Sequence, residues 1–336
     1  MDQALRPSPH VRGTWALAVL LVLAVVVVTA SVLWGRYPMT AGDVWRAIVA
    51  PDADPTITRI VTQIRAPRIA AAMLVGMALA VAGTVYQGMF RNPLVSPDLL
   101  GASAGAGFGA SLAIVLGTGL ASIQILAFGF GLLAVLTAWS VSRSMRRDPL
   151  LGLILAGIVV SAVFSAGTSF LKYVADPNQQ LPAITFWLMG GFNGVRVDQL
   201  PPLAGIIVVC GGVLWFCRWR LNVISFSDES ARTLGVDVRA VRALVVVAAT
   251  LITTASVSVG GLISWVGLVV PHLVRLAVGP DFRRLLPLAA IAGAIFLLIV
   301  DDIARNLTTM EVPLGILTAL VGGPFMLALI LRDRSW

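Results

Sequence analysis

Residues 14–34 read TWALAVLLVLAVVVVTASVLW, and no charged side chain interrupts them. A transmembrane α-helix needs about 20 apolar residues to cross a hydrocarbon core about 30 Å thick, and this run is long enough. Val28, Thr29 and Ala30 could pass for the cleavage site of a signal peptide, but the apolar core of a signal peptide spans only about 7–15 residues. We therefore interpret the run as a retained first transmembrane helix.

Similar apolar segments follow along the whole chain. Its 336 residues are 58% hydrophobic and 12% charged, whereas a soluble domain carries about 25% charged residues. The pattern predicts an all-α polytopic membrane protein, a single transmembrane domain over residues 1–336 with about ten transmembrane helices. The weakest divisions fall at Gly117 to Gly119 and Gly260 to Gly261, where a glycine turn must split a long apolar stretch. The predicted spans are 14–34, 66–87, 99–117, 121–142, 150–174, 200–217, 241–259, 262–279, 286–303 and 313–331.

Basic residues in the segments between these spans predict the orientation. If the amino terminus is cytoplasmic, 16 of the 24 Lys and Arg residues lie inside and 8 lie outside. Cytoplasmic loops of membrane proteins carry the excess of Lys and Arg, so both termini are expected in the cytoplasm, with residues 1–13 as a cytoplasmic tail. The net charge of +8 then reflects membrane topology, and no nucleic-acid partner is expected.

Two segments outside the predicted spans are long enough to fold. Residues 40–50 are expected on the outer side of the membrane and predict a short amphipathic surface helix, with Thr40 as its N-cap. Residues 218–242 lie inside and form the longest polar stretch. They predict two short helices, with Asp228 and Glu229 at a helix start and Gly235 at its end.

Small residues recur at helical spacing in two predicted spans. Gly101, Gly105 and Gly109 predict close packing against a neighbouring helix. A second stripe adds hydroxyl groups at every fourth position, and it could either pack in the interior or line a hydrated path. The stripe comprises Gly157, Ser161, Ser165 and Ser169. The proline-bearing segment 91–97 predicts a stiff turn at the inner mouth.

Charged groups are almost absent from the span interiors. Asp301, Asp302 and Arg305 stand at the end of the ninth span, where their spacing predicts an ion pair at the membrane edge. An ion-coupled secondary transporter would be expected to hold ionisable groups in mid-membrane, which argues against that alternative. A membrane-embedded enzyme is a third possibility, but no catalytic residue, metal cluster or phosphate-binding loop is found, so no cofactor is expected on this chain.

Several motifs, in order along the chain, resemble the FecCD-type permeases, which serve ABC importers of ferric siderophores, haem and vitamin B12. The resemblance covers residues from about 40 to the carboxyl terminus. The motifs are RAPR (65–68), QGMFRNPL (87–94), PDLLG (97–101), WLMGG (187–191), ARTLGV (231–236), VGLVVPH (266–272) and EVPLG (311–315).

This resemblance implies a permease of the bacterial inner membrane that works by alternating access. It implies a second permease copy or paralogue, two cytoplasmic ATPase subunits that bind ATP and Mg²⁺, and a periplasmic or lipid-anchored binding protein. An iron-siderophore-type chelate is the expected substrate, with haem, cobalamin or an oxyanion as alternatives.

The resemblance also implies roles for particular residues. Outward-facing arginines, which bind carboxylates in bidentate fashion, are expected to dock the binding protein; they are Arg65, Arg68 and Arg305. A turn of the inner segment is expected to contact the ATPase through Ser230, Ala231, Leu234 and Gly235. The inner gate is expected at Asn92 and Leu94, and the translocation path along Gly157, Ser161, Ser165 and Ser169. The doubled Asp301 and Asp302 leave the pairing of Arg305 open.

Overall fold

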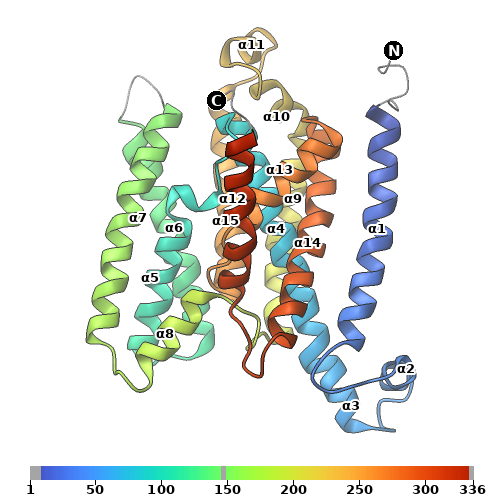
Figure 1. The fold of residues 1–336 in the computed structure, drawn as a ribbon. Helices are drawn as coiled ribbons and strands as arrows, with labels where there is room; N and C mark the ends of the chain where they lie inside the picture. Colours follow the sequence, from blue (N-terminus) through green and yellow to red (C-terminus); the bar gives the residue numbers. More distant parts are fainter. Residues whose placement is uncertain (1–8, 145–148, 333–336) are drawn as a thin grey trace.

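A computed structural model describes residues 9–144 and 149–332 (Figure 1). Every regular element in these two ranges is helical. The predicted all-α class is therefore confirmed. Residues 1–8 of the predicted cytoplasmic tail lie outside the described ranges, whereas residues 9–13 already belong to the first helix.

Ten long helices occupy the ten apolar segments that the sequence indicated. Seven of the helices in the described ranges are long and apolar enough to cross a membrane, so the chain is a multi-pass membrane protein. α5, α13 and the stretch 314–329 of α15 are apolar but shorter than this criterion requires, so ten crossings stay a prediction. The ten helices are α1 (Pro9–Leu33), α4 (Ala66–Phe90), α5 (Ala102–Val115), α6 (Leu120–Ser142), α7 (Pro149–Val174), α9 (Leu200–Phe216), α12 (Val238–Gly260), α13 (Val266–Val278), α14 (Phe282–Asn306) and α15 (Leu314–Arg332).

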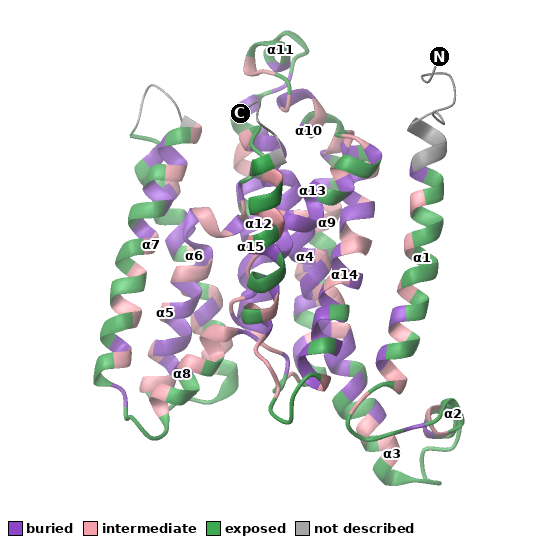
Figure 2. Cartoon of the chain, viewed as in Figure 1, coloured by how far each residue is buried: buried purple, intermediate pink, exposed green. Residues whose placement is uncertain are grey.

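Helix α4 forms the centre of the bundle (Figure 2). In its apolar window 78% of residues are buried, against 6% in α1, which stands at the edge. Glycine makes this central packing possible. A Cβ on Gly76 would lie 2.2 Å from the carbonyl oxygen of Gly293 in α14, and one on Gly83 would lie 1.7 Å from that of Gly267 in α13. Membrane helices approach this closely only where small residues meet.

A second group of helices, α5, α6 and α7, packs beside this centre. A Cβ on Gly105 would lie 2.4 Å from the carbonyl oxygen of Phe130, and one on Gly109 would lie 2.2 Å from that of Leu126. Both oxygens belong to α6, so the predicted close packing through this glycine stripe is confirmed. The expected glycine turns are also present, because Gly117 and Gly261 adopt φ values of +67° and +68° between their helices.

Short helices stand at both ends of the bundle. At one end lie α2 (Ala41–Val49) and α3 (Pro55–Arg59), and the π-helix η1 (Ile60–Arg65) joins α3 to α4. The predicted surface helix is confirmed as α2, whose first turn is closed by a capping box between Thr40 and Asp43. Helix α8 (Gln180–Met189) also lies towards this end (Figure 1), although no sequence signal predicted it.

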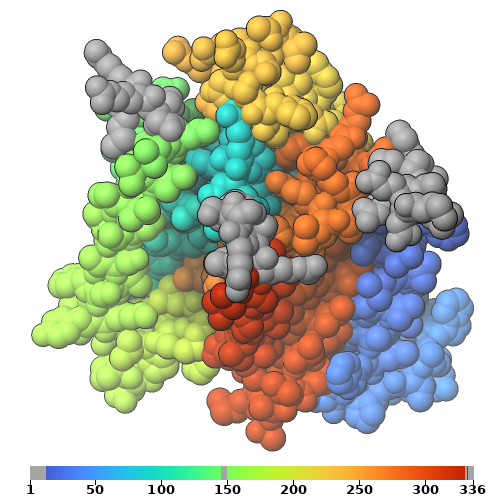
Figure 3. Space-filling model, turned by 45° about the horizontal axis from the view of Figure 1, so that its top comes forward, coloured from blue at the N-terminus to red at the C-terminus, as the bar shows by residue number. Residues whose placement is uncertain are grey.

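The opposite end carries the predicted pair of short helices, α10 (Arg218–Ile224) and α11 (Asp228–Thr233). Figure 3 brings this end forward and shows them gathered at one edge of the molecule. The 3-10 turns η2 (Pro97–Leu100) and η3 (Val197–Gln199) complete the described elements.

Candidate functional site

Polar side chains concentrate at two places, one at each end of the bundle. After the orientation expected from the sequence, we call the first the outer network: Ser31, Arg36, Arg65, Arg68, Asp301, Asp302, Arg305 and Glu311. It lies towards the end that carries α2 and α3. We call the second the inner clamp: Arg91, Asp228 and Arg242, with the α10–α11 segment that they hold.

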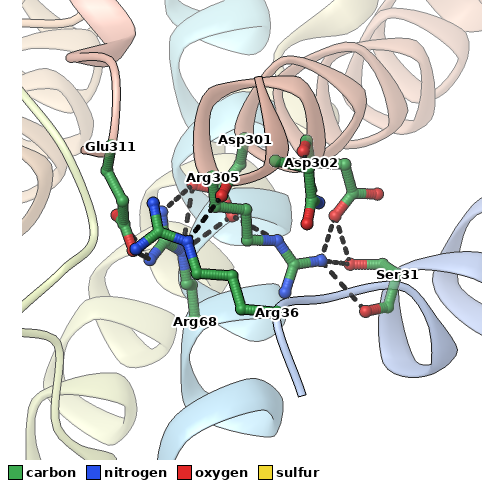
Figure 4. A network of polar contacts seen from close by, with 8 residues as sticks. Ser31, Arg36, Arg68, Asp301, Asp302, Arg305 and Glu311 are labelled. Atoms are coloured by element: carbon green, nitrogen blue, oxygen red, sulfur yellow. Dashed lines mark hydrogen bonds and ion pairs between the residues drawn. The ribbon is translucent and has the colours of Figure 1, made fainter. Parts of the chain in front are cut away.

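In the outer network, Arg68 sits between two carboxylates (Figure 4). Its Nε donates to Asp301 Oδ2 at 2.9 Å and its Nη2 to Asp301 Oδ1 at 2.9 Å, while Nη1 donates to Glu311 Oε2 at 2.9 Å. Asp301 is fully buried, whereas the side chain of Glu311 keeps 24% of its surface exposed. These bonds join α4 to α14 and to the segment before α15.

Arg305 makes the other half of the outer network. Its Nη2 donates to Asp302 Oδ1 and, at 2.8 Å, to Ser31 Oγ in α1. Ser31 in turn donates to Asp302 Oδ1 at 2.7 Å. Asp302 therefore provides the pairing of Arg305 that the sequence left open. The predicted ion pair is confirmed, because Arg305 pairs with Asp302 and lies 3.9 Å from Asp301 in the last turns of α14. All three residues are buried, which the sequence did not indicate.

Arg65, Arg68 and Arg305, the arginines expected to dock a binding protein, are all buried in the single chain, and their docking role stays a prediction. Their exposed fractions are 4%, 8% and 7%. Arg65 donates to the backbone carbonyl oxygens of Val32 and Tyr37, so its guanidinium fixes the loop after α1. The physical reason is that a charged group at a packed helix end is stable only when internal acceptors replace water.

An outer cavity of about 530 Å³ adjoins the network. Arg36, Arg68 and Glu311 line it together with Gly190 and Met310. Arg36 reaches it from the loop after α1 and donates to the carbonyl oxygens of Arg305 and Thr308 at 3.2 and 3.1 Å. Of the three predicted docking arginines, Arg68 is the one that borders this cavity.

At the other end, Asp228 in α11 holds the inner clamp together. Its Oδ1 accepts from Arg91, which follows α4, and from Arg242 of α12 at 2.7 Å. Arg91 also donates to the carbonyl oxygen of Ile224 in α10 from Nε and Nη2, at 3.1 and 3.0 Å. Burial acts to raise the pKa of the Asp228 carboxyl, but Arg242 and Arg91 outweigh it and hold the pKa below its usual value. The carboxylate therefore stays charged at neutral pH.

The four predicted coupling residues lie within one turn at the tip of the inner clamp. Ser227 caps α11 by accepting from the backbone N–H of Ser230 at 2.9 Å. Ala231 is fully buried beneath the turn, while Leu234 is 60% exposed. Gly235 adopts φ +76°, which suits the glycine predicted to end the helix.

The predicted gate residues follow Arg91 directly. The backbone N–H of Leu94 donates to Asn92 Oδ1 at 2.8 Å, which closes a turn just beyond α4. Both side chains are exposed. Arg91 itself has φ +53°, a left-handed conformation that is costly for a residue with a side chain. The turn is thus held in place by the same arginine that holds α11.

The predicted path along α7 divides into two parts. Gly157 is buried, and a Cβ there would lie 2.2 Å from the carbonyl oxygen of Leu99, so this position serves packing against η2. Ser161 is half-buried beside Gly101, whereas Ser165 and Ser169 are exposed on the surface of the chain. Only the last two positions are open to a partner or to a path.

Sequence reasoning gave no role to Ser31, Arg36, Glu311, Asp228 or Arg242. Asp228 was noted only as a helix start, although its clamp spans three helices. No group of three or more His, Cys, Asp or Glu suited to a metal ion occurs in the part of the chain that the structure describes.

Comparison with known proteins places this architecture among transport proteins. The chain matches the FecCD transport family over residues 21–332. It is 37% identical to the molybdate import system permease protein MolB of Haemophilus influenzae, with 98% of each chain covered. It is 40% identical to the cobalamin import system permease protein BtuC of Halobacterium salinarum, over 98% of this chain and 91% of the relative.

A solved structure, described as a metal-chelate type ABC transporter in an inward-facing conformation, has the same fold. It superposes with a TM-score of 0.85 at 37% identity and covers 94% of this chain and 98% of its own. With the match extending over nearly every helix described above, the chain belongs to the FecCD transport family.

Proposed function

We propose that the chain is the permease subunit of an ABC importer, and that two partner ATPases drive it through the inner clamp. The observation that carries the proposal is Asp228, which ties the exposed turn of α11 to the end of α4 and the start of α12. Because α4 is the buried centre of the bundle, a force applied to α11 reaches the core directly. Binding energy at one site can thus tilt packed helices at another.

The tip of the inner clamp offers apolar surface to a partner. Phe226 is 81% exposed and Leu234 is 60% exposed, although both lie in the polar segment between α9 and α12. Exposed apolar residues next to a structured turn are typical of a protein contact site. The ATPase would contact Ser230, Leu234 and Gly235, with buried Ala231 supporting the turn.

A matched pair of variants tests this role. Tagged chains that carry Leu234→Asp or Met310→Asp are purified from membranes of the native host, and the co-purifying ATPase is quantified. Both positions are exposed and apolar, at 60% and 73%, but Met310 belongs to the outer cavity. Leu234→Asp is expected to lower the recovered ATPase at least about tenfold, which corresponds to ~1.4 kcal/mol. Wild-type recovery with Leu234→Asp would remove α11 as the coupling element.

The orientation that accompanies this proposal has α11 and both termini in the cytoplasm and ten membrane crossings. The excess of arginine on the α11 side supports it. Cysteines introduced at Ser230 and Arg196 test it with a membrane-impermeant maleimide on intact cells. The native Cys210 and Cys217, which are both buried, are replaced first, so that only the introduced cysteine can react. Labelling is expected at position 196 alone, and labelling at 230 instead would invert the topology.

Alternating access requires a gate and a second subunit. We assign the gate to Asn92 and Leu94, since Arg91 holds their turn against α10 and α11. Ser165 and Ser169 on the exposed face of α7 would line the path between this chain and a second permease copy or paralogue. A cross-link between cysteines placed at Ser169 in two copies would support a homodimer.

Docking of a binding protein is proposed at the outer cavity, through Arg68. Glu311 already occupies one side of its guanidinium and is partly exposed, so a carboxylate of the binding protein could replace it. Glu311→Gln removes this competitor while Asp301 still neutralises Arg68. The variant is expected to bind the loaded binding protein more tightly, by about fivefold, the equivalent of ~1 kcal/mol. Weaker binding would mean that Glu311 itself makes the contact.

The substrate we propose is an iron-siderophore-type metal chelate, with haem, cobalamin or an oxyanion as alternatives. The similarity to the metal-chelate type transporter supports a chelate as the substrate, whereas the similarity to the molybdate permease supports an oxyanion. Uptake of radiolabelled ferric siderophore, haem, cobalamin and molybdate by cells with and without the chain separates them. Uptake that persists in vesicles lacking any ATPase would instead favour a secondary transporter.

A further inference from the structure

A second large cavity lies at the end of the bundle that carries α11. Its volume is about 1100 Å³. The last turn of α6, the first turns of α7 and α12, and α11 with the loop that follows it provide most of its lining. Because these are the ends of apolar helices, the cavity lies at the depth where a bilayer passes from acyl chains to headgroups.

The polar part of the lining carries an excess of positive charge. Four arginines stand against two aspartates, and both aspartates are already engaged. Asp228 pairs with Arg242 and Arg91, and Asp237 accepts from the backbone N–H groups of Arg239 and Ala240 as the N-cap of α12. No acidic side chain in residues 9–144 and 149–332 pairs with the remaining three, which are Arg143, Arg232 and Arg239.

Arg242 adds a further unmet donor. Its side chain is only 17% exposed, and its buried Nε has no hydrogen-bond acceptor among the described residues. A buried guanidinium donor without an acceptor is costly. An anion that entered the cavity would supply that acceptor and would neutralise the surrounding arginines.

The remainder of the lining is apolar. Met89, Trp139, Leu150, Leu153 and Val246 contribute to it. The guanidinium of Arg143 lies 5.1 Å from the centroid of the Trp139 ring, so cation and aromatic surface are adjacent. A small inorganic anion would gain nothing from this apolar surface. A molecule that carries both a phosphate and a hydrocarbon chain would match both parts.

We propose that this cavity binds an anionic phospholipid, with its phosphate between Arg143 and Arg239 and an acyl chain along the apolar lining. Basic pockets between transmembrane helices recognise anionic headgroups in this way. The site goes beyond the proposed transport function and does not depend on it. It would connect α6 and α7 to α11 and α12 through a bound lipid.

The full-length chain in nanodiscs provides the test. Wild-type protein is placed in phosphatidylcholine containing a minor fraction of spin-labelled phosphatidylglycerol or spin-labelled phosphatidylcholine, and the motionally restricted fraction of each is measured. The test variant is Arg143→Gln with Arg239→Gln. The control is Arg218→Gln with Arg220→Gln, which removes two charges at the same end of the bundle; Arg218 also lies over a tryptophan, 4.5 Å from the Trp215 ring.

Wild type and control are expected to prefer phosphatidylglycerol over phosphatidylcholine. In the cavity variant this preference is expected to fall roughly fivefold for each arginine removed, because each basic residue contributes about 1 kcal/mol to the binding of an anionic lipid. Equal preference in the cavity variant and the wild type would overturn the proposal. So would displacement of the labelled lipid by millimolar inorganic phosphate, which would indicate a free-anion site. Loss of ATPase co-purification in the cavity variant with unchanged lipid preference would assign these arginines to the partner protein instead.

Discussion

The outer network provides a sharp energetic prediction at Asp301. Asp301→Asn removes the negative charge that faces Arg68 but keeps the shape of the side chain. Arg68 donates to this carboxylate from both Nε and Nη2, and its side chain is only 10% exposed. Removing one partner of a buried ion pair costs about 3–5 kcal/mol. We expect the free energy of unfolding to fall by ~3 kcal/mol, since Asn can still accept one of the bonds and Glu311 remains nearby.

Reversible unfolding in mixed detergent micelles, followed by tryptophan fluorescence, measures this loss. Glu311→Gln is expected to cost ~1 kcal/mol, because its side chain is partly solvated. Asp198→Asn is the control, since the pair with Arg196 is 69% and 66% exposed, and it should change stability by less than ~0.5 kcal/mol. Replacing both buried partners, as in Arg68→Met with Asp301→Leu, should recover much of the loss. Equal stability of Asp301→Asn and Asp198→Asn would refute the reasoning.

Three other predictions concern the inner clamp and the core. Because the pKa of Asp228 is lowered, its stabilising contribution is complete above the usual aspartate value of about 3.9 and is lost as pH falls through the lowered value. A spin label at Ser230→Cys should therefore stay immobile from about pH 7 to 5 and become mobile only below about pH 4, whereas Asp228→Asn should be mobile throughout. Arg91→Gly removes the backbone strain of a left-handed residue, ~1–2 kcal/mol, but it also removes the charged hydrogen bonds of Arg91, worth about 1.5–3 kcal/mol each. The same label should therefore gain mobility, and a more rigid label would contradict this. Gly83→Ala places a Cβ 1.7 Å from a carbonyl oxygen and should prevent stable folding. A Cβ at Gly205 would meet nothing within 4 Å, so Gly205→Ala should stabilise the folded chain by ~0.4–1 kcal/mol. The yield of monodisperse protein on gel filtration distinguishes the two variants.

Much of the fold could be predicted from local sequence. Long apolar runs define transmembrane helices without reference to the rest of the chain, because a bilayer leaves backbone groups no other partners. The cap at Thr40, the helix start at Asp228 and the turn at Gly235 are likewise local signals. Helix α8 escaped prediction because its ten residues are too few to form a separate span and have no side-chain N-cap.

The outer network could not be predicted in the same way. Arg68 is separated from Asp301 by 233 positions, and Ser31 from Arg305 by 274. Spacing within one helix indicated only that Arg305 pairs locally with Asp301 or Asp302. Ser31 lies in an apolar run where a lone serine carries no signal. Its role follows only from the packing of α1 against α14.

The continuous helix that begins at Pro55 and ends at Phe90 has one further consequence. Its 36 residues would span about 54 Å at 1.5 Å per residue. This length exceeds the thickness of a bilayer with its headgroups, roughly 40–45 Å. A helix of this length fits a bilayer only if it tilts or extends beyond the headgroups, and at its end Phe90 is followed by Arg91, which pairs with Asp228. The same run carries Arg65 and Arg68 of the outer network and leads directly into Arg91 of the inner clamp, so a rigid-body displacement of this helix would move both sites together.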